Sequence, residues 1–193
     1  MYRLIMATKA KHITITGSLG SGKSVVSSLL HEELGYPVVS VGGILRKMAQ
    51  EYNMDTTQFN IYMEQHPELD YELDNRVTAM GKEELPYIFD SRLAWHFVPS
   101  SFKVALIVDD SIAAQRIFQD SARLNETYNN DEEARERIQQ RRKSELLRYK
   151  QLYKVDLEAT ENYDLVIDTG GYTPKEVASK ILSAYKEACE KES

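Results

Sequence analysis

The sequence is poor in the features that mark secreted and membrane-bound proteins. It has a single cysteine, Cys189, which excludes an intramolecular disulfide and a cysteine-rich metal site. No apolar run approaches the roughly 20 residues that a membrane-spanning helix needs. The N-terminal segment MYRLIMATKAK is too short and too interrupted to resemble a signal peptide. We therefore expect a cytoplasmic protein that makes no membrane contact.

Positive charge is also scarce. The 193 residues include 24 Lys and Arg against 30 Asp and Glu, which gives a formal net charge of −6. Because affinity for a polyanion depends largely on Lys and Arg contacts to phosphates, this balance argues against a dedicated nucleic-acid-binding protein. The histidines His12, His31, His66 and His96 show no ligand spacing, so no transition-metal site is predicted. The length suits one compact domain, and we expect a monomer.

Apolar, β-branched runs alternate along the chain with longer segments of helical period. This alternation is typical of βα units that build a parallel sheet. Most of the runs are almost continuously apolar, as expected for strands that helices cover on both faces. The prediction is a three-layer α/β fold with a five-stranded parallel sheet. The predicted strands are residues 12–16, 37–40, 86–90, 102–109 and 163–169.

Capping residues mark the ends of several predicted helices. Gly35 is a natural left-handed stop for a helix over residues 23–34. Asp55, with Gln58 three residues later, has the pattern of a capping box. Three further helices are expected to begin at the caps Asp110, Asn130 and Thr173.

Two connections are longer than a strand-to-strand crossover requires. Residues 42–85 join the second and third predicted strands, and residues 110–162 join the fourth and fifth. Both contain helical patterns. Because ligands bind outside the carboxyl ends of the strands in open α/β sheets, these insertions are placed to cover a binding site.

The strongest motif is GSLGSGKS at residues 17–24, which satisfies GxxxxGK[ST] between a predicted strand and a predicted helix. Its backbone N–H groups and the following helix N-terminus can surround a phosphate. Lys23 is expected to reach the β- and γ-phosphates, and Ser24 to bind Mg²⁺. The fold is therefore predicted to be of the P-loop NTPase type. The expected ATP-binding residues here are Gly17, Ser18, Gly20, Ser21, Gly22, Lys23 and Ser24.

An acidic residue at a strand end should help Ser24 to hold the magnesium ion. Asp90 is favoured because Ser91 and Arg92 follow it directly at the predicted edge of the sheet. Asp109 and Asp110 follow the next predicted strand, but Asp110 is more simply explained as a helix cap.

Arginine is the side chain suited to clamping phosphates during transfer, because its planar fork binds them in a bidentate way. Arg46 and Arg92 adjoin strand ends near the P-loop, and we prefer a functional role for both. For the remaining candidates, a surface ion pair stays about as plausible as a role in the site. The candidate arginines are Arg46, Arg92, Arg116, Arg141 and Arg148.

Several stretches in order resemble the cytidylate kinase family, particularly its shorter archaeal-type branch. They are ITITGSLGSGKS, ELGYPVVSVGGILRKMA, PELDYELDNR, FDSRLAW, RRKSELLRYKQLYKVD and YDLVIDT, which together cover roughly residues 12–182. The resemblance implies a helical insertion that binds a nucleoside monophosphate (NMP), and a helical lid. The implied division is a core of residues 10–41, 86–119 and 157–193, an NMP-binding insertion of residues 42–85, and a lid of residues 120–156.

The resemblance also implies roles for individual residues. Arg46 and Arg92 would hold the acceptor monophosphate, and Arg116 would lie against the donor nucleotide. Arg141 and Arg148 would close with the lid on the transferring phosphate, which makes Lys23, Arg92, Arg141 and Arg148 the expected catalytic residues. Further acceptor contacts are expected at Asp74 and Arg76, and the expected metal ligands are Ser24 and Asp90.

The implied reaction transfers the γ-phosphate of ATP·Mg²⁺ directly to a pyrimidine monophosphate, CMP or dCMP. No partner other than small-molecule nucleotides is expected. One alternative is another small-acceptor P-loop kinase of the adenylate, shikimate or dephospho-coenzyme A type, although the adenylate kinase sequence DGFPR is absent. A second is a nucleotide-binding regulatory protein with weak turnover. It is motivated by Gly43 and Asp120, which replace residues usual in the family.

Overall fold

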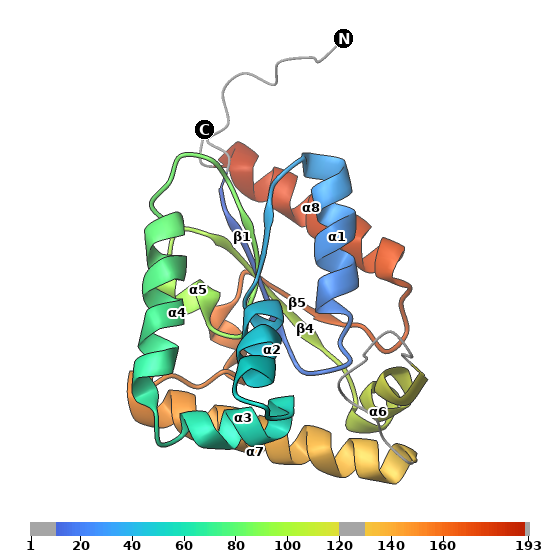
Figure 1. Ribbon diagram of the computed structural model, residues 1–193. Helices are drawn as coiled ribbons and strands as arrows, with labels where there is room; N and C mark the ends of the chain where they lie inside the picture. Colours follow the sequence, from blue (N-terminus) through green and yellow to red (C-terminus); the bar gives the residue numbers. More distant parts are fainter. Residues whose placement is uncertain (1–10, 120–129, 192–193) are drawn as a thin grey trace.

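Figure 1 shows the computed structural model, which describes residues 11–119 and 130–191. A five-stranded sheet with the order β2-β3-β1-β4-β5 forms its centre, and every neighbouring pair of strands is parallel. The predicted α/β fold with a five-stranded parallel sheet is confirmed. The strands are β1 (Ile13–Gly17), β2 (Val38–Ser40), β3 (Ile88–Asp90), β4 (Phe102–Ile107) and β5 (Leu165–Asp168).

Helices cover both faces of this sheet. On one face lie α1 and α8, which pack on each other, and on the other lie α4 and α5 (Figure 1). The helices of the described residues are α1 (Lys23–Leu34), α2 (Val41–Glu51), α3 (Thr56–Met63), α4 (Pro67–Met80), α5 (Ala94–Phe97), α6 (Asp110–Gln119), α7 (Asp131–Tyr153) and α8 (Pro174–Lys191), with a 3-10 turn η1 (Thr160–Asn162). None of these helices is long and apolar enough to cross a membrane.

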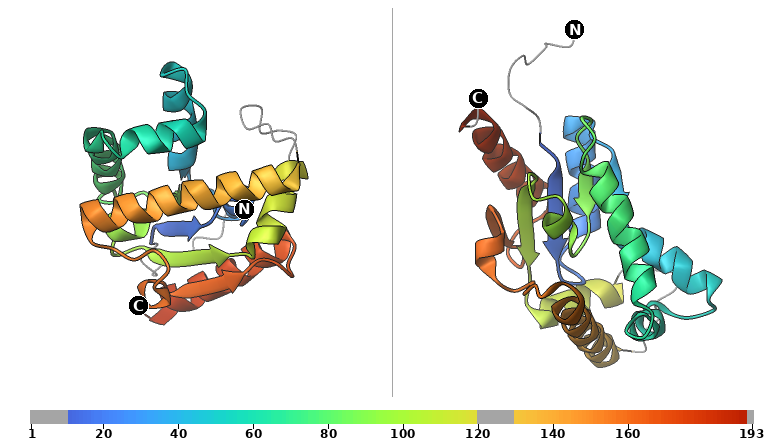
Figure 2. Two further views of the ribbon diagram at one scale, coloured as in Figure 1. Left: turned by 90° about the horizontal axis from the view of Figure 1, so that it is seen from below. Right: turned by 90° about the vertical axis from the view of Figure 1, so that its left-hand side faces the viewer.

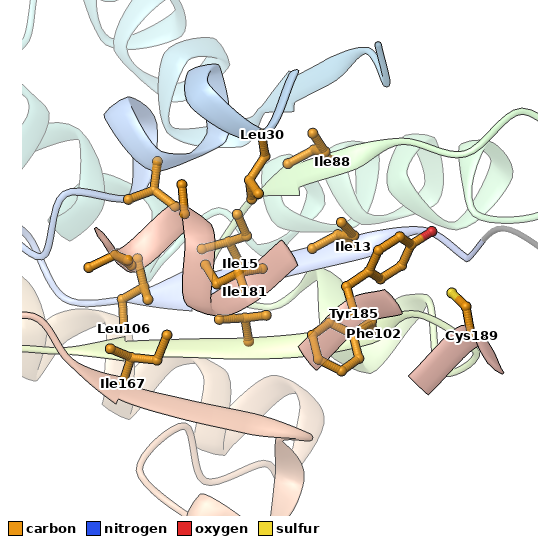
Figure 3. Close-up of a cluster of buried hydrophobic side chains, with 14 residues drawn as sticks. Ile13, Ile15, Leu30, Ile88, Phe102, Leu106, Ile167, Ile181, Tyr185 and Cys189 are labelled. Carbon is orange, nitrogen blue, oxygen red and sulfur yellow. The ribbon is translucent and has the colours of Figure 1, made fainter. Parts of the chain in front are cut away.

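The alternation of side chains along the strands divides the core into two layers. Ile13 and Ile15 of β1 point into the layer beneath α1 and α8, where they meet Leu30 and Ile181 (Figure 3). In β3, Ile88 belongs to that same layer, while its neighbour Phe89 packs against residues of α4 and α5 on the opposite face. Because helices cover both faces, β3 carries a buried apolar residue on each side.

The predicted left-handed stop Gly35 ends α1, and the predicted N-caps are confirmed at three other helices. Asp55 and Gln58 form a reciprocal capping box at α3, Asn130 accepts the backbone N–H of Glu133 at α7, and Thr173 with Glu176 caps α8. The prediction that Asp110 caps α6 is wrong. Asp109 fills that place, because its backbone carbonyl accepts from Ala113 and its carboxylate accepts from Ser111. Asp120, which replaces a residue usual in the family, lies outside the described residues.

The two long connections meet at the carboxyl ends of the strands. The first forms α2, α3 and α4, which enclose a small apolar cluster of their own that includes Leu45, Phe59 and Met63. The second contains α7, which runs across the carboxyl ends of the strands and packs on α6 and α3 (Figures 1 and 2). This arrangement surrounds the P-loop with elements from both insertions.

Candidate active site

The turn after β1 is shaped by close contacts that only glycine permits. At Gly17, with φ +149°, an added Cβ would lie 2.3 Å from the carbonyl oxygen of Leu106. At Gly20, with φ +74°, an added Cβ would lie 2.7 Å from the carbonyl oxygen of Ala113. The turn therefore packs against β4 and α6 with its backbone, and its shape is that of a phosphate cradle built from backbone N–H groups.

Lys23 begins α1 and bends back over this turn. Its Nζ donates to the carbonyl oxygens of Gly17 at 2.7 Å and Ser18 at 3.1 Å. Burial, together with the nearby Arg92, lowers the pKa of Lys23 to about 7, although Asp90 and Glu145 oppose the shift. An anion bound beside Lys23 would therefore raise its pKa again and keep the ammonium group charged.

Ser24 and Asp90 come together directly beside Lys23. The Ser24 hydroxyl donates to Asp90 Oδ2 at 2.9 Å, and the parallel pairing of β3 with β1 sets Asp90 opposite Ile15. A hydroxyl and one carboxylate suit Mg²⁺, which takes few protein oxygens and completes its shell with substrate phosphates and water. Within residues 11–119 and 130–191, no group of three or more His, Cys, Asp or Glu could hold a metal ion. The pair at Ser24 thus fits a magnesium ion that arrives with a nucleotide.

Arg92 and Arg141 meet on a shared carboxylate from α7. Arg92 Nε lies 2.8 Å from Glu145 Oε2, and Arg141 Nε donates to Glu145 Oε1 at 3.1 Å. Arg92 also donates to the carbonyl oxygen of Gly17 in the P-loop. The arginine that follows β3 is thereby joined to an arginine of α7 at the edge of the phosphate cradle.

Arg116 of α6 closes the other side of the cradle. Its guanidinium donates to the carbonyl oxygens of Gly20 at 3.3 Å and Thr169 at 2.8 Å. Beyond it, the loop after β5 brings Tyr172, which is 43% exposed and has the Lys180 ammonium 4.5 Å above its ring. An aromatic ring open to solvent beside a phosphate cradle can stack on a nucleotide base.

One cavity of about 440 Å³ connects these groups. It runs from the P-loop and Arg116 at one end to Leu45 and Arg46 of α2 at the other. Its length offers room for a phosphate-bearing ligand at each end of the P-loop. The predicted site residues that line it are Ser18, Gly20, Ser21, Gly22, Lys23, Ser24, Arg46, Asp90, Arg92, Arg116 and Arg141.

Four predicted site residues do not line this cavity: Gly17, Asp74, Arg76 and Arg148. Arg148 is 2% exposed and donates to the Asn60 carbonyl oxygen at 3.0 Å, with its Nε 3.0 Å from Asp70 Oδ2. Asp74 accepts a hydrogen bond from the Tyr153 hydroxyl. Arg76 lies on an exposed face of α4 and pairs with Glu72. In this arrangement Arg148 and Asp74 join α7 to the insertion, and their expected roles with substrate stay predictions.

Glu145, Tyr149 and Tyr172 line the cavity but were not among the predicted site residues. A signal for Glu145 existed, because it follows Arg141 by four residues and so shares its helix face. In a segment so rich in charge, that spacing equally predicts a surface pair. For the two tyrosines the sequence offers no signal that separates them from the other ten.

Comparison with known proteins points to one group of relatives. A family model described as the cytidylate kinase-like family matches residues 12–171. The chain is 36% identical over 160 residues to a cytidylate kinase from Methanothermobacter thermautotrophicus, and the match covers 83% of this chain and 96% of that protein.

A further relative is considerably larger. It is an S-adenosylmethionine-dependent nucleotide dehydratase from Lacinutrix mariniflava, 37% identical over 181 residues, and the match covers 91% of this chain but 36% of that protein. Among solved structures, a shikimate kinase from Acinetobacter baumannii has a TM-score of 0.56 at 18% identity, covering 94% of this chain and 96% of that chain. At this identity the likeness shows the fold alone.

The lowered pKa of Lys23 predicts that ATP binding weakens with rising pH. Above pH 7 the free protein carries a neutral Lys23, whereas the phosphates favour the protonated form. We expect the Kd for ATP to increase between pH 7.5 and 9, by up to about tenfold per pH unit. Titration with a fluorescent ATP analogue measures it. Lys23→Met should bind weakly at all pH values without this slope, and a constant Kd for the unaltered protein would contradict the prediction.

The buried position of Arg148 predicts a structural contribution that a purely catalytic arginine would not make. Arg148→Met leaves Asp70, which is 4% exposed, without its cation. We expect the free energy of unfolding to fall by about 3–5 kcal/mol in urea denaturation. Asp70→Asn introduced into the Arg148→Met variant should lower the free energy of unfolding by less than it does alone, since the two side chains form one pair.

Arg135 offers a matched control, because it lies on the exposed side of the same helix. Arg135→Met should change the free energy of unfolding by no more than about 0.5 kcal/mol. Equal stability of the Arg148 and Arg135 variants would show that the buried pair contributes nothing to the fold.

Proposed function

Because the chain belongs to the cytidylate kinase-like family, and is an ATP-dependent phosphotransferase of the nucleoside-monophosphate kinase class, we propose that its acceptor is CMP or dCMP. The observation that carries the proposal is the single cavity that joins the P-loop to Arg46. A P-loop alone accounts for a bound triphosphate. A second cationic end to the same cavity accounts for a second phosphate-bearing substrate, and relatives named cytidylate kinase support a pyrimidine nucleotide there.

We propose that ATP occupies the end of the cavity that Arg116 and Tyr172 close. The P-loop N–H groups and Lys23 would hold its β- and γ-phosphates, and Tyr172 would lie beside its base. Ser24 and Asp90 would hold Mg²⁺, which supplies charge neutralisation on the phosphate oxygens when it is bound.

The acceptor monophosphate would bind between Arg46 and Arg92. Its oxygens are already ionised at neutral pH, so transfer needs no strong general base. The rate would come from alignment of the two substrates and from stabilisation of charge on the transferring group. Arg92 lies between the two ends of the cavity, bonded to Gly17 of the P-loop, and is therefore placed to contact both substrates.

We also propose that the chain divides by role as the resemblance implies. Residues 42–85 form the acceptor-binding insertion, and residues 120–156 form the lid, of which the structure describes 130–156. In support, Leu45 and Arg46 of the insertion and Arg141 of α7 line the same cavity. Closure of such elements excludes water, which limits hydrolysis of ATP in the absence of transfer.

The proposal predicts acceptor-dependent ADP formation. We expect turnover with ATP·Mg²⁺ and CMP or dCMP to exceed that with AMP, GMP or shikimate by at least about tenfold, measured by a coupled ADP assay. Lys23→Met should abolish turnover with every acceptor. A preference for another acceptor would replace CMP in the proposal. ATP binding without turnover on any acceptor would favour a regulatory role instead.

The position of Arg46 predicts a specific defect in acceptor binding. Arg46→Gln removes a charged donor from the acceptor end, so the KM for CMP should rise about 10- to 100-fold while the KM for ATP changes little. The adjacent Lys47 is exposed and lies outside the cavity lining, which makes Lys47→Gln the matched control. Equal effects of the two variants on the KM for CMP would refute this placement of the acceptor phosphate.

A further inference from the structure

The most unusual group in the cavity is a carboxylate placed among cations that should bind phosphate. Glu145 is 4% exposed, and its two oxygens divide between Arg92 and Arg141. Both contacts are made by Nε, the guanidinium nitrogen nearest the chain. One carboxylate thus fixes the plane of an arginine from the sheet edge and of another from α7.

The charges around Glu145 explain why a carboxylate is needed there. Lys23, Arg92 and Arg141 all line the cavity within the electrostatic reach of one another. Like charges gathered in a poorly solvated space repel strongly. Among the described residues that face Lys23, Asp90 and Glu145 are the groups that offset this repulsion. The arginines hold the pKa of Glu145 below its usual range although burial acts in the opposite direction.

Glu145 also lies between two cavities. Behind the P-loop, on the side of β4, lies a second cavity of about 320 Å³, and Arg92 and Glu145 line both cavities. Arg92 therefore has open space on two sides. Apart from Glu145, the structure holds its guanidinium through the Gly17 carbonyl oxygen. Loss of the carboxylate would allow this side chain to turn away from the transfer site.

We propose that Glu145 is a positioning residue for phosphoryl transfer, whose carboxylate holds Arg92 and Arg141 side by side where the transferring group passes. The inference rests on the proposed function, because it assigns those arginines to that group. Glu145 acts through these arginines and does not itself contact the transferring group.

The test compares Glu145→Gln with Glu136→Gln, which removes the same charge from an exposed position of the same helix. Glu145→Gln should lower kcat about 10- to 100-fold, while the KM for ATP stays within about threefold. The loss is expected because small displacements of catalytic groups, here the two guanidinium groups, reduce the rate by about this factor. Glu145→Asp keeps the charge and should recover part of kcat. Glu136→Gln should match the unaltered protein. Circular dichroism and thermal unfolding confirm that each variant folds.

The split between kcat and KM, together with partial recovery in Glu145→Asp, gives a readout that a merely structural role would not move. A structural defect would lower stability in both Glu145 variants, whereas a positioning role predicts a loss of kcat that follows the loss of the carboxylate.

The outcomes separate this inference from the proposed function. If the unaltered protein phosphorylates no nucleoside monophosphate, the proposed function fails and the positioning role fails with it. An unchanged kcat in Glu145→Gln would overturn the positioning role. So would a lower KM for CMP with unchanged kcat, because the carboxylate would then act as a competitor of the acceptor phosphate.

Discussion

The rest of the site depends on one electrostatic constraint: several cations must lie close together before any phosphate is present. Lys23, Arg92 and Arg141 converge on one cavity at the carboxyl end of the sheet. The free protein balances them with Glu145, with Asp90 and with backbone carbonyls of the P-loop. Arriving phosphates then take over interactions that the protein has already oriented. Such preorganisation is what makes electrostatic stabilisation effective, because the protein does not need to reorganise during the reaction.

Much of this arrangement could be predicted from local sequence. Local motifs predicted the P-loop and the caps at Asp55 and Asn130. The contact between Ser24 and Asp90 followed from the P-loop motif and from the position of Asp90 at a strand end. The predicted cap Asp110 failed by one position, because two adjacent aspartates offer the same side chain and only the backbone decides between them. Propensity and capping rules define elements well, and they define ends to within a residue or two.

Contacts between distant elements were beyond the sequence. Arg141 and Arg148 are seven residues apart and share a helix face, yet about 10 Å of helix separates them along the axis. That distance carries Arg148 past the cavity to Asn60 and Asp70, whereas Arg141 remains at the cavity. The spacing of two residues on a helix predicts whether they share a face. It does not predict which element packs against that face. Glu145 was hidden for the same reason, since its partner Arg92 follows a strand more than fifty residues earlier.

The contacts along α7 have a consequence for how the two substrates influence each other. Arg137, Ser144, Arg148 and Tyr153 all bond to the insertion, while Glu145 on the same helix holds the arginines of the transfer site. If the two nucleotides bind as proposed, a displacement of α7 would change the acceptor side and the donor side together. Thermodynamic linkage would make this coupling reciprocal, so that ATP and the acceptor would change each other's affinity by the same factor. A single helix would then couple the two substrates.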